Sequence, residues 1–162
     1  MSKHPALKLE NQICHSLYSA TNALIRAYRP LLENLELTYP QYLVMLALWD
    51  EDKVIIKDLV QRTRFDAGTL TPILKRLESK QLVSIGKSST DSRQKVVLLS
   101  AHGKALANKA KQVPDALSCQ IDMSPEDALQ LKALAEQLYA LINSCQSSAS
   151  EPEPKTKTKP SK

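Results

Sequence analysis

The 162-residue chain is poor in aromatic residues and glycine, and this shortage argues against a β-rich fold. Aromatic residues make up 4% of the sequence, and there are three glycines. Many-stranded sandwiches and barrels need turn glycines and strands of aromatic or β-branched residues. Leu, Ala, Lys and Gln, which favour helix, are frequent instead. The composition predicts a mainly α protein, and an apolar fraction of 43% is enough for a core.

The chain also lacks a long hydrophobic run. The longest covers eight residues, 42–49, whereas a membrane-spanning helix needs about 20. Residues 1–5 lead into no apolar stretch, so we expect neither a secretory signal nor a membrane partner. Three cysteines, an odd number, argue against a disulfide scaffold and predict a reducing, cytoplasmic location.

The sequence gives little indication of a metal site or of an enzyme active site. The histidines, His4, His15 and His102, are far apart, and no C-x-x-C spacing occurs. The glycines are scattered and form no phosphate-binding loop. No Ser-His-acid set is suggested by the spacing. We therefore expect no metal, no cofactor and no catalytic residue.

Positive charge is concentrated in the middle of the chain. Residues 53–111 hold 13 Lys/Arg and 4 Asp/Glu, whereas the remainder holds 9 and 13, for a net charge of +5. A basic middle between acidic ends is typical of a polyanion-binding module. A basic face that is merely solvated is the alternative interpretation.

Hydrophobic periodicity and capping signals predict the first elements. A first helix carries Leu9, Ile13, Leu17, Leu24, Leu31 and Leu35 on one face, with Pro30 bending its last turn. Thr38 and Gln41 form a capping box for a second helix that ends near Trp49. A short edge strand, 54–56, and a helix, 57–64, follow.

The next residues predict a helix-turn-helix and a wing. A turn at 65–68 leads to a helix that reaches Lys80, capped by Asp66 or by Thr71. Strands at 82–85 and 95–99 enclose a polar, basic loop, 86–94. This order is typical of a winged helix-turn-helix, in which the second helix enters the major groove and the wing reaches the adjacent minor groove.

Charge and topology together predict that these two elements bind duplex DNA. The candidate contacts are Thr69, Thr71, Pro72, Lys75 and Arg76 on the recognition helix and Lys87, Arg93 and Gln94 on the wing. We assign no individual base contacts, because each basic residue can equally bind a phosphate or remain solvated.

The last part of the chain predicts two further helices and a tail. Ser100 caps a helix that carries Leu106, Ala110, Val113 and Leu117 inward. Ser124 and Pro125 start another helix. Its apolar residues have heptad spacing and form a seam, which predicts packing on a further helix; they are Leu131, Leu134, Leu138, Leu141 and Cys145. Residues 146–162, rich in Ser, Glu, Pro, Lys and Thr, are expected to be disordered.

Long helices that flank a central winged helix resemble the MarR family of dimeric regulators, over residues 5–145. Four strings resemble the organic hydroperoxide resistance regulators within that family: 11–14, 26–32, 37–45 and 68–77. The spacing of Cys14, Tyr28 and Tyr39 is the most specific feature. Asp91, Ser92 and Arg93 fit the general wing pattern, with an Asp91–Arg93 salt bridge.

The resemblance implies one domain with three regions and a tail. Residues 1–35 would form a dimerisation and sensor helix, 36–99 the winged helix-turn-helix, and 100–145 the C-terminal dimerisation helices. It also implies a homodimer that binds operator DNA as a repressor and is released from that DNA by organic hydroperoxides. Cys14 would be oxidised to a sulfenic acid, and Cys119 of the partner chain, near the start of the last helix, would resolve it.

The residues themselves leave alternatives for the sensor. Most lone cysteines are small buried hydrophobes, whereas a reactive one needs access and a stabilised thiolate. Fourteen helical residues rise about 21 Å, so Tyr28 cannot reach Cys14 within one straight helix. Either Tyr28 is ordinary core or the pocket is built across a dimer. Tyr18, one turn from Cys14, can reach it within the chain.

Cys119 is predicted in a loop, where a thiol can move to form a disulfide. Its alternative is a partly buried loop thiol without function, and Cys145 or a small cellular thiol could resolve Cys14 instead. Two other functions use the same residues. A thiol peroxidase would use Cys14 in turnover, and a ligand-sensing regulator would bind a small aromatic compound with passive cysteines.

Overall fold

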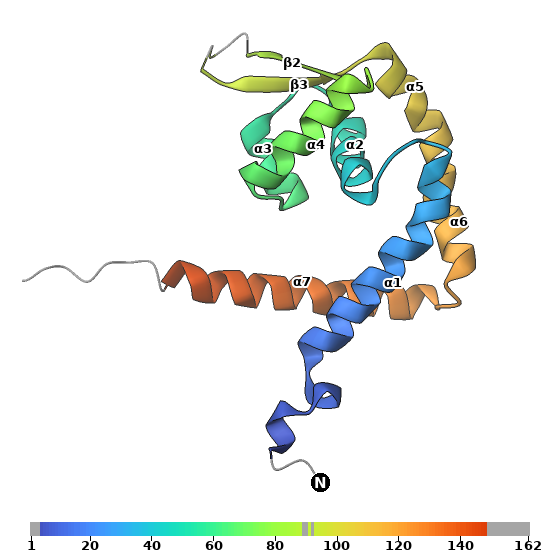
Figure 1. Cartoon of the computed structure of the whole chain (residues 1–162), viewed down its shortest axis with the longest axis vertical. Helices are drawn as coiled ribbons and strands as arrows, with labels where there is room; N and C mark the ends of the chain where they lie inside the picture. Colours follow the sequence, from blue (N-terminus) through green and yellow to red (C-terminus); the bar gives the residue numbers. More distant parts are fainter. Residues whose placement is uncertain (1–3, 89–90, 92, 149–162) are drawn as a thin grey trace, which may run out of the picture. The chain divides into compact units, whose positions relative to one another are not determined.

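The computed structural model describes residues 4–88, 91 and 93–148 (Figure 1). They form two compact units, of which one ends at Ile121 and the other begins at Asp122. The first contains helices α1 to α6 and a small sheet, and the second contains α7 (Pro125–Ser148). Helix α7 extends three residues into the predicted tail, and the rest of that tail lies outside the described residues. The mainly α class and the winged helix-turn-helix are confirmed.

Helix α1 (Ile13–Glu33) begins later than the hydrophobic pattern suggests. Two short 3₁₀ turns, η1 (Pro5–Leu7) and η2 (Leu9–Asn11), precede it. The side chain of Gln12 donates to the carbonyl of Ala6 at 2.6 Å and so ties these turns to the helix start. Cys14 therefore lies in the first turn of α1.

The capping box of α2 (Tyr39–Asp50) is confirmed. The Gln41 N–H donates to Thr38 Oγ1 at 3.5 Å, and the Thr38 N–H donates to Gln41 Oε1 at 3.1 Å. These bonds satisfy donors that the helix start leaves unpaired. The predicted edge strand is β1 (Val54–Ile55), and α3 (Ile56–Thr63) follows at once.

Asp66, not Thr71, caps the recognition helix α4 (Ala67–Ser79). Asp66 accepts from the Thr69 N–H at 2.8 Å and from the Thr69 hydroxyl at 2.6 Å. These bonds from Thr69 hold the pKa of Asp66 below its usual value. Pro72 consequently lies inside the helix, where it removes one backbone hydrogen bond.

The sheet is antiparallel with strand order β1-β3-β2. Strands β2 (Val83–Lys87) and β3 (Lys95–Leu99) pair from Val83 opposite Leu99 to Lys87 opposite Lys95. The hairpin is longer than predicted because Gly86 and Lys87 pair with β3 instead of belonging to the loop. The Ser88 N–H donates to the Gln94 carbonyl at 2.9 Å and continues the pairing into the wing.

The single helix predicted from Ser100 to Leu117 is divided at Lys111. It forms α5 (Ala101–Ala110) and α6 (Gln112–Gln120). Pro114 has no N–H to donate to the Ala110 carbonyl, which explains the break. The four residues predicted to face inward are buried: Leu106, Ala110, Val113 and Leu117.

One hydrophobic core holds the first unit together. It joins the C-terminal end of α1 to α2, α3, α4, the hairpin, α5 and α6. Its most buried large side chains are Leu32, Val44, Met45, Leu48, Leu59, Leu70, Leu74, Leu77 and Val97. Because α4 contributes three of these, the recognition helix is fixed to the core by one face and leaves the opposite face free.

Several apolar residues of α1 and α7 lie outside this core. On α1 they are Ile13 (70% exposed), Leu17, Leu24 and Ile25, and on α7 they are Leu129, Leu131, Leu134, Leu141 and Ile142. Leu138, another leucine of the predicted seam, is half-buried. Apolar surface of this extent on a helix indicates an interaction face. Among the described residues, no helix has both the length and the apolar character that crossing a bilayer requires.

Gly103 allows α5 to approach the sheet closely, and this contact gives a test of the fold. A Cβ at position 103 would lie 2.1 Å from the Leu82 carbonyl oxygen, a backbone atom that already accepts from the Ser100 N–H. We expect Gly103→Ala to lower the free energy of unfolding by about 1–3 kcal/mol, as overpacking does. Urea unfolding at fixed protein concentration measures it.

Gly86→Ala is the matched control, because a Cβ there meets nothing within 4 Å. An equal loss of stability in both variants would show that the close approach of α5 is unimportant.

Candidate DNA-binding and redox sites

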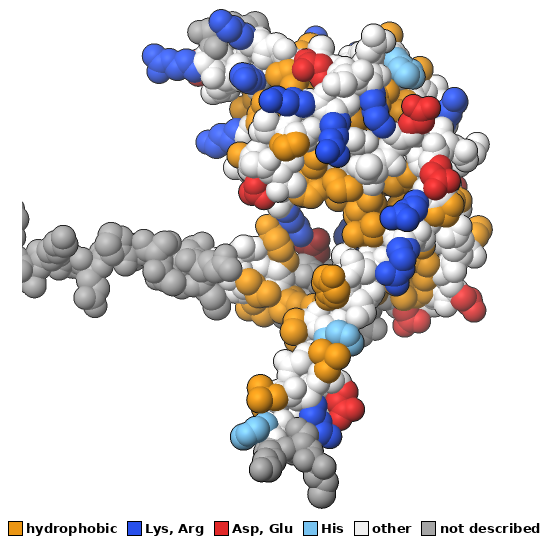
Figure 2. Space-filling view, in the orientation of Figure 1, with side chains coloured by type: hydrophobic (Ala, Val, Ile, Leu, Met, Phe, Trp, Pro, Cys, Tyr) orange, Lys and Arg blue, Asp and Glu red, His pale blue; other side chains and the backbone are white. Residues whose placement is uncertain are grey.

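The free face of α4 carries the residues predicted to contact DNA. Thr69, Thr71, Pro72, Lys75 and Arg76 are all exposed, whereas Leu70, Leu74 and Leu77 between them are buried. The predicted wing residues Lys87, Arg93 and Gln94 are exposed too. Figure 2 shows Lys and Arg side chains gathered over α4 and the hairpin. The arrangement presents a helix and a wing on one basic surface.

Asp91 organises the part of the wing that the structure describes. Its carboxylate Oδ1 accepts from the Arg93 N–H at 3.0 Å, and its carbonyl accepts from the Gln94 N–H at 2.9 Å. The contact seen between Asp91 and Arg93 is thus to the backbone of Arg93. The salt bridge between their side chains stays a prediction, and Ser92 lies outside the described residues.

Asp52 anchors the base of the wing to α5. Its Oδ1 accepts from the Leu99 N–H at 2.8 Å, and its Oδ2 pairs with Lys104 Nζ at 2.8 Å. Burial raises the pKa of Asp52, but the bonds from Lys104, Leu99 and Lys53 outweigh burial and hold it below its usual value. Asp52 therefore stays ionised at neutral pH and holds the end of β3.

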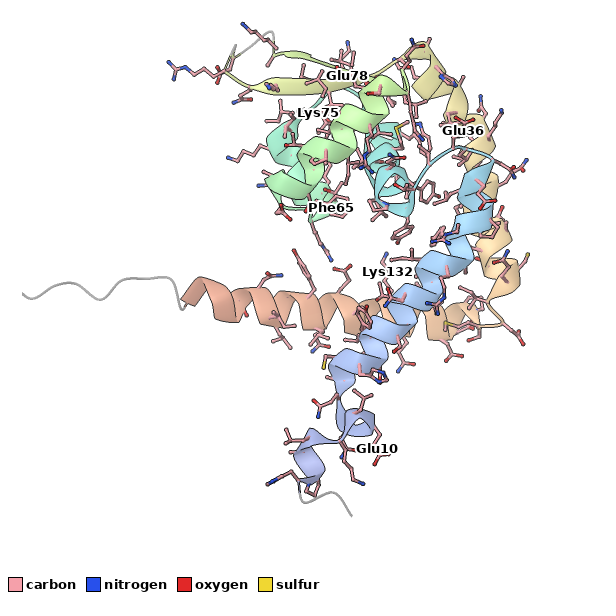
Figure 3. All side chains as sticks on the ribbon, in the orientation of Figure 1. Glu10, Glu36, Phe65, Lys75, Glu78 and Lys132 are labelled. Atoms are coloured by element: carbon pink, nitrogen blue, oxygen red, sulfur yellow. The ribbon has the colours of Figure 1, made fainter. Side chains whose placement is uncertain are left out.

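A cleft of about 410 Å³ lies between α4 and the hairpin. Lys75 of α4 and the facing residues Lys87 and Lys95 of the hairpin line it. Figure 3 labels Lys75 and Glu78, both of which extend from α4 beside the strands. Lys95 was not among the residues predicted to bind DNA. Its part in the cleft depends on the hairpin register, which places it opposite Lys87.

Tyr28 of α1 and Tyr39 of α2 are brought together, although they come from different helices. Their ring centroids are 4.8 Å apart, and Tyr42 lies 5.8 Å from Tyr28. Tyr42 was not predicted as part of this group. Burial, and then the neighbouring Tyr39 and Tyr42, raise the pKa of Tyr28 to about 12. Burial likewise raises the pKa of Tyr39.

The tyrosine hydroxyls are therefore protonated at neutral pH and can donate hydrogen bonds. Within the described ranges, neither the Tyr28 nor the Tyr39 hydroxyl has a hydrogen-bond partner. Because both residues are only half-buried, their hydroxyls are accessible and can donate to a polar or anionic group of a second chain.

Cys14 lies apart from these tyrosines. It is an exposed free thiol in the first turn of α1, whereas Tyr28 lies fourteen residues along the same helix, a rise of about 21 Å. Tyr18, one turn from Cys14, is 70% exposed. The single chain therefore brings Tyr28 and Tyr39 together but leaves Cys14 outside the group.

Cys119 was predicted to lie in a loop, but it lies in the last turn of α6. Helix α6 extends to Gln120, beyond Leu117, the last residue predicted to face inward. The Cys119 thiol is free and exposed. Cys145 belongs to α7, and its side chain lies outside what the structure describes.

Comparison with known proteins places the chain among transcription regulators. Residues 26–110 match the family model of the transcriptional regulator SarA/Rot. The organic hydroperoxide resistance transcriptional regulator of Bacillus subtilis (strain 168) is 38% identical over 141 residues, which cover 87% of this chain and 94% of that protein.

Solved structures of a second relative, AbfR, share the fold. A structure of reduced AbfR bound to DNA covers 89% of this chain and 99% of its own, with 28% identity and a TM-score of 0.73. A structure of disulfide-formed AbfR covers 81% and 92%, with 30% identity and a TM-score of 0.59. AbfR is a protein of Staphylococcus epidermidis. The chain therefore belongs to the MarR-type, SarA/Rot-like family of winged-helix transcriptional regulators, which includes the organic hydroperoxide resistance regulator.

Proposed function

We propose that the protein is a homodimeric, cytoplasmic repressor that binds operator DNA while Cys14 is reduced and releases it when an organic hydroperoxide oxidises Cys14. The observation that carries this proposal is the pairing of Tyr28 with Tyr39, two protonated hydrogen-bond donors, together with the exposed Cys14 thiol at the start of α1. The relatives that are hydroperoxide regulators or were solved in reduced and disulfide forms support the same interpretation.

The DNA-binding part of the proposal depends on α4 and the wing. Helix α4 packs on the core through one face. Its exposed face can therefore enter the major groove without any change in how the helix packs on the core. The basic wing would follow the adjacent minor groove. A dimer would place two such helices in successive grooves, and its operator would consist of two half-sites one helical turn apart.

The dimer itself is inferred from exposed apolar surface. The N-terminal half of α1 and one face of α7 expose leucine and isoleucine side chains that a second copy can bury. Each fully buried side chain of this kind stabilises the assembly by about 1.5–3 kcal/mol. Both helices belong to the regions predicted to form the dimer interface.

The dimer also explains how Cys14 acquires a pocket. Cys14 lies among the exposed apolar residues of α1, between Ile13 and Leu17, so the surface that pairs two copies includes the thiol. In the proposal, Tyr28 and Tyr39 of one protomer donate hydrogen bonds to the Cys14 thiolate of its partner. Bonds to the charged form favour it, and the first turn of α1 adds the positive end of the helix dipole.

An organic hydroperoxide is a sufficient oxidant for the proposed reaction at Cys14. The thiolate sulfur attacks the distal oxygen of ROOH, the O–O bond breaks, and the departing alkoxide takes a proton to become the alcohol. Cys14 is left as a sulfenic acid. The Cys119 thiolate of the partner then attacks that sulfur, an S–S bond forms, the S–O bond breaks, and the departing hydroxide takes a proton to become water. Cellular thiols can reverse both products, so the switch resets.

The position of Cys119 near the end of α6 affects the second step. A disulfide needs the Cα atoms of Cys14 and of the partner's Cys119 within about 7 Å of each other. Because Cys119 lies in the last turn of α6 and not in a loop, closing any longer distance would move α6 or α1. Such a shift moves helices that pack on the core carrying α4. Coupling of this kind would make the disulfide, more than the sulfenic acid, the state that releases the operator.

The two alternative functions are less well supported. A thiol peroxidase has no need of the basic α4–wing surface, and the relatives are regulators. A sensor of small aromatic ligands would not need a thiol on the dimerisation surface. No specific observation favours either.

The first prediction concerns Cys14 itself. We expect Cys14→Ser to keep its affinity for operator duplex but to lose the release that cumene hydroperoxide causes in the wild type, because serine cannot form a sulfenic acid. Fluorescence anisotropy of a labelled operator fragment measures both. Cys119→Ser is the matched control and should be oxidised but release less DNA. Equal release by wild type and Cys14→Ser would reject Cys14 as the sensor.

The second prediction concerns the tyrosines. We expect Tyr28→Phe and Tyr39→Phe each to slow Cys14 oxidation by about tenfold or more, since a hydrogen bond to a charged group contributes about 1.5–3 kcal/mol. Stopped-flow kinetics with a sulfenic-acid probe give the rate. Tyr18→Phe separates the two geometries. If Cys14 oxidation is slowed in Tyr18→Phe but unchanged in Tyr28→Phe and Tyr39→Phe, the hydrogen bond to Cys14 lies within one chain.

A further inference from the structure

Trp49, the one tryptophan of the chain, joins helix α2 to helix α5. Its indole N–H donates to the carbonyl of Gly103 at 2.8 Å, across 54 positions of sequence. An indole N–H donates and cannot accept, so this bond fixes the direction of the ring as well as its place. The half-buried ring therefore ties the last turn of α2 to the first turn of α5.

Gly103 is also in close contact with the base of the wing. A Cβ at this position would lie 2.1 Å from the carbonyl oxygen of Leu82, the residue before β2. The start of α5 thus touches both the Trp49 indole and the chain that enters β2. Because so little space separates these groups, a displacement of the indole either moves the start of α5 against β2 or breaks the Trp49–Gly103 bond.

The other strand of the wing is held by the same turn of α5. Lys104 Nζ pairs with Asp52 Oδ2, and Asp52 Oδ1 accepts from the N–H of Leu99, the last residue of β3, both at 2.8 Å. Figure 1 shows α5 starting at the base of the hairpin. The orientation of both strands therefore depends on where the first turn of α5 lies.

Tyr42 links the indole to the candidate sensor tyrosines. Its side chain is 2% exposed, and its ring centroid lies 6.2 Å from that of Trp49, edge-on, and 5.8 Å from that of Tyr28. Tyr28 belongs to α1, whereas Tyr42 and Trp49 belong to α2. Close-packed interior side chains transmit displacement, because there is no free space to absorb it. A movement of Tyr28 thus reaches the indole through one buried ring.

We propose that Trp49 is a positioning residue through which the sensor sets the orientation of the wing. In the reduced protein, the indole bond holds the first turn of α5, and with it both strands, in the orientation that follows the minor groove. Oxidation of the partner's Cys14 removes the thiolate to which Tyr28 and Tyr39 donate, and these rings shift. Tyr42 passes the shift to Trp49, and the wing loses that orientation. The inference rests on the proposed function and deepens it, because it names how the redox state of Cys14 reaches the wing.

Trp49→Phe tests the bond, since phenylalanine keeps an aromatic ring but lacks the N–H. We expect Cys14 in this variant to react with cumene hydroperoxide at the wild-type rate, measured by stopped flow. The ratio of operator affinities between reduced and oxidised protein, measured by fluorescence anisotropy, should fall about three- to tenfold, as the loss of one hydrogen bond predicts. A positioning residue separates oxidation from release in this way, whereas a merely structural one does not.

Val60→Ala is the matched control, because Val60 of α3 packs on the same core and takes no part in the contacts from Tyr28 to the wing. It should lower the temperature of unfolding and leave the affinity ratio unchanged. An equal fall of the ratio in both variants would overturn the role of Trp49. A wild-type ratio in Trp49→Phe, or a slowed oxidation of its Cys14, would overturn it too.

Emission from Trp49 gives a second test that leaves the contacts intact, since no other tryptophan contributes. We expect cumene hydroperoxide to change this emission in the wild-type protein without DNA. Cys14→Ser should show no change, which excludes direct attack of peroxide on the indole. Operator release with constant Trp49 emission would overturn the inference and leave the proposed function intact. Oxidation of Cys14 without operator release would overturn the proposed function, and the inference with it.

Discussion

Helix α1 is a straight connection that keeps Cys14 and Tyr28 about 21 Å apart, and the proposed function depends on that separation. A thiol and its hydrogen-bond donors on one helix cannot meet within a chain, however well each is placed. In the proposed dimer, each copy would offer a thiol at one end of α1 and a pair of tyrosine donors at the other. Sensing would then depend on the dimer, which would also set the spacing of the recognition helices.

Continuous contacts lead from the tyrosines to the base of the wing. Tyr28 packs on Tyr42, and Tyr42 meets Trp49 edge-on at 6.2 Å. The Trp49 indole N–H donates to the Gly103 carbonyl at 2.8 Å, in the first turn of α5. Lys104 of the same turn pairs with Asp52, which holds β3. A change at the sensor would thus act on the helix and strand that position the wing.

Local signals in the sequence predicted much of the fold. The Thr38 capping box, the Ser100 cap and the order of helices, turn and hairpin depend on residues that are neighbours in the chain, and the structure confirms them. The break at Lys111 was missed because the hydrophobic pattern runs through it, although Pro114 gives the physical reason. The placement of Cys119 in a loop was wrong for a similar reason, because the helix continues past its last buried residue, Leu117.

The candidate sites were less predictable, because they depend on contacts between distant residues. The nearness of Tyr28 and Tyr39 was expected only from the family resemblance, since spacing alone does not bring two helices together. The pairing of Lys95 with Lys87 requires the hairpin register, which the sequence does not determine when the turn lies in a long polar loop. Asp66 and Thr71 are equal candidates for the cap of α4 in the sequence, and the hydrogen bonds from Thr69 decide for Asp66.

Mixed dimers test most directly whether the sensor pocket is shared between two copies. One chain carries Cys14→Ser, the other carries Tyr28→Phe with Tyr39→Phe, and different affinity tags isolate the mixed species. The account predicts that the remaining Cys14 reacts with cumene hydroperoxide at the wild-type rate, because its partner supplies both tyrosines. A dimer with all three substitutions on one chain should instead react slowly. A mixed dimer as slow as the doubly substituted tyrosine homodimer would contradict a pocket built across the interface.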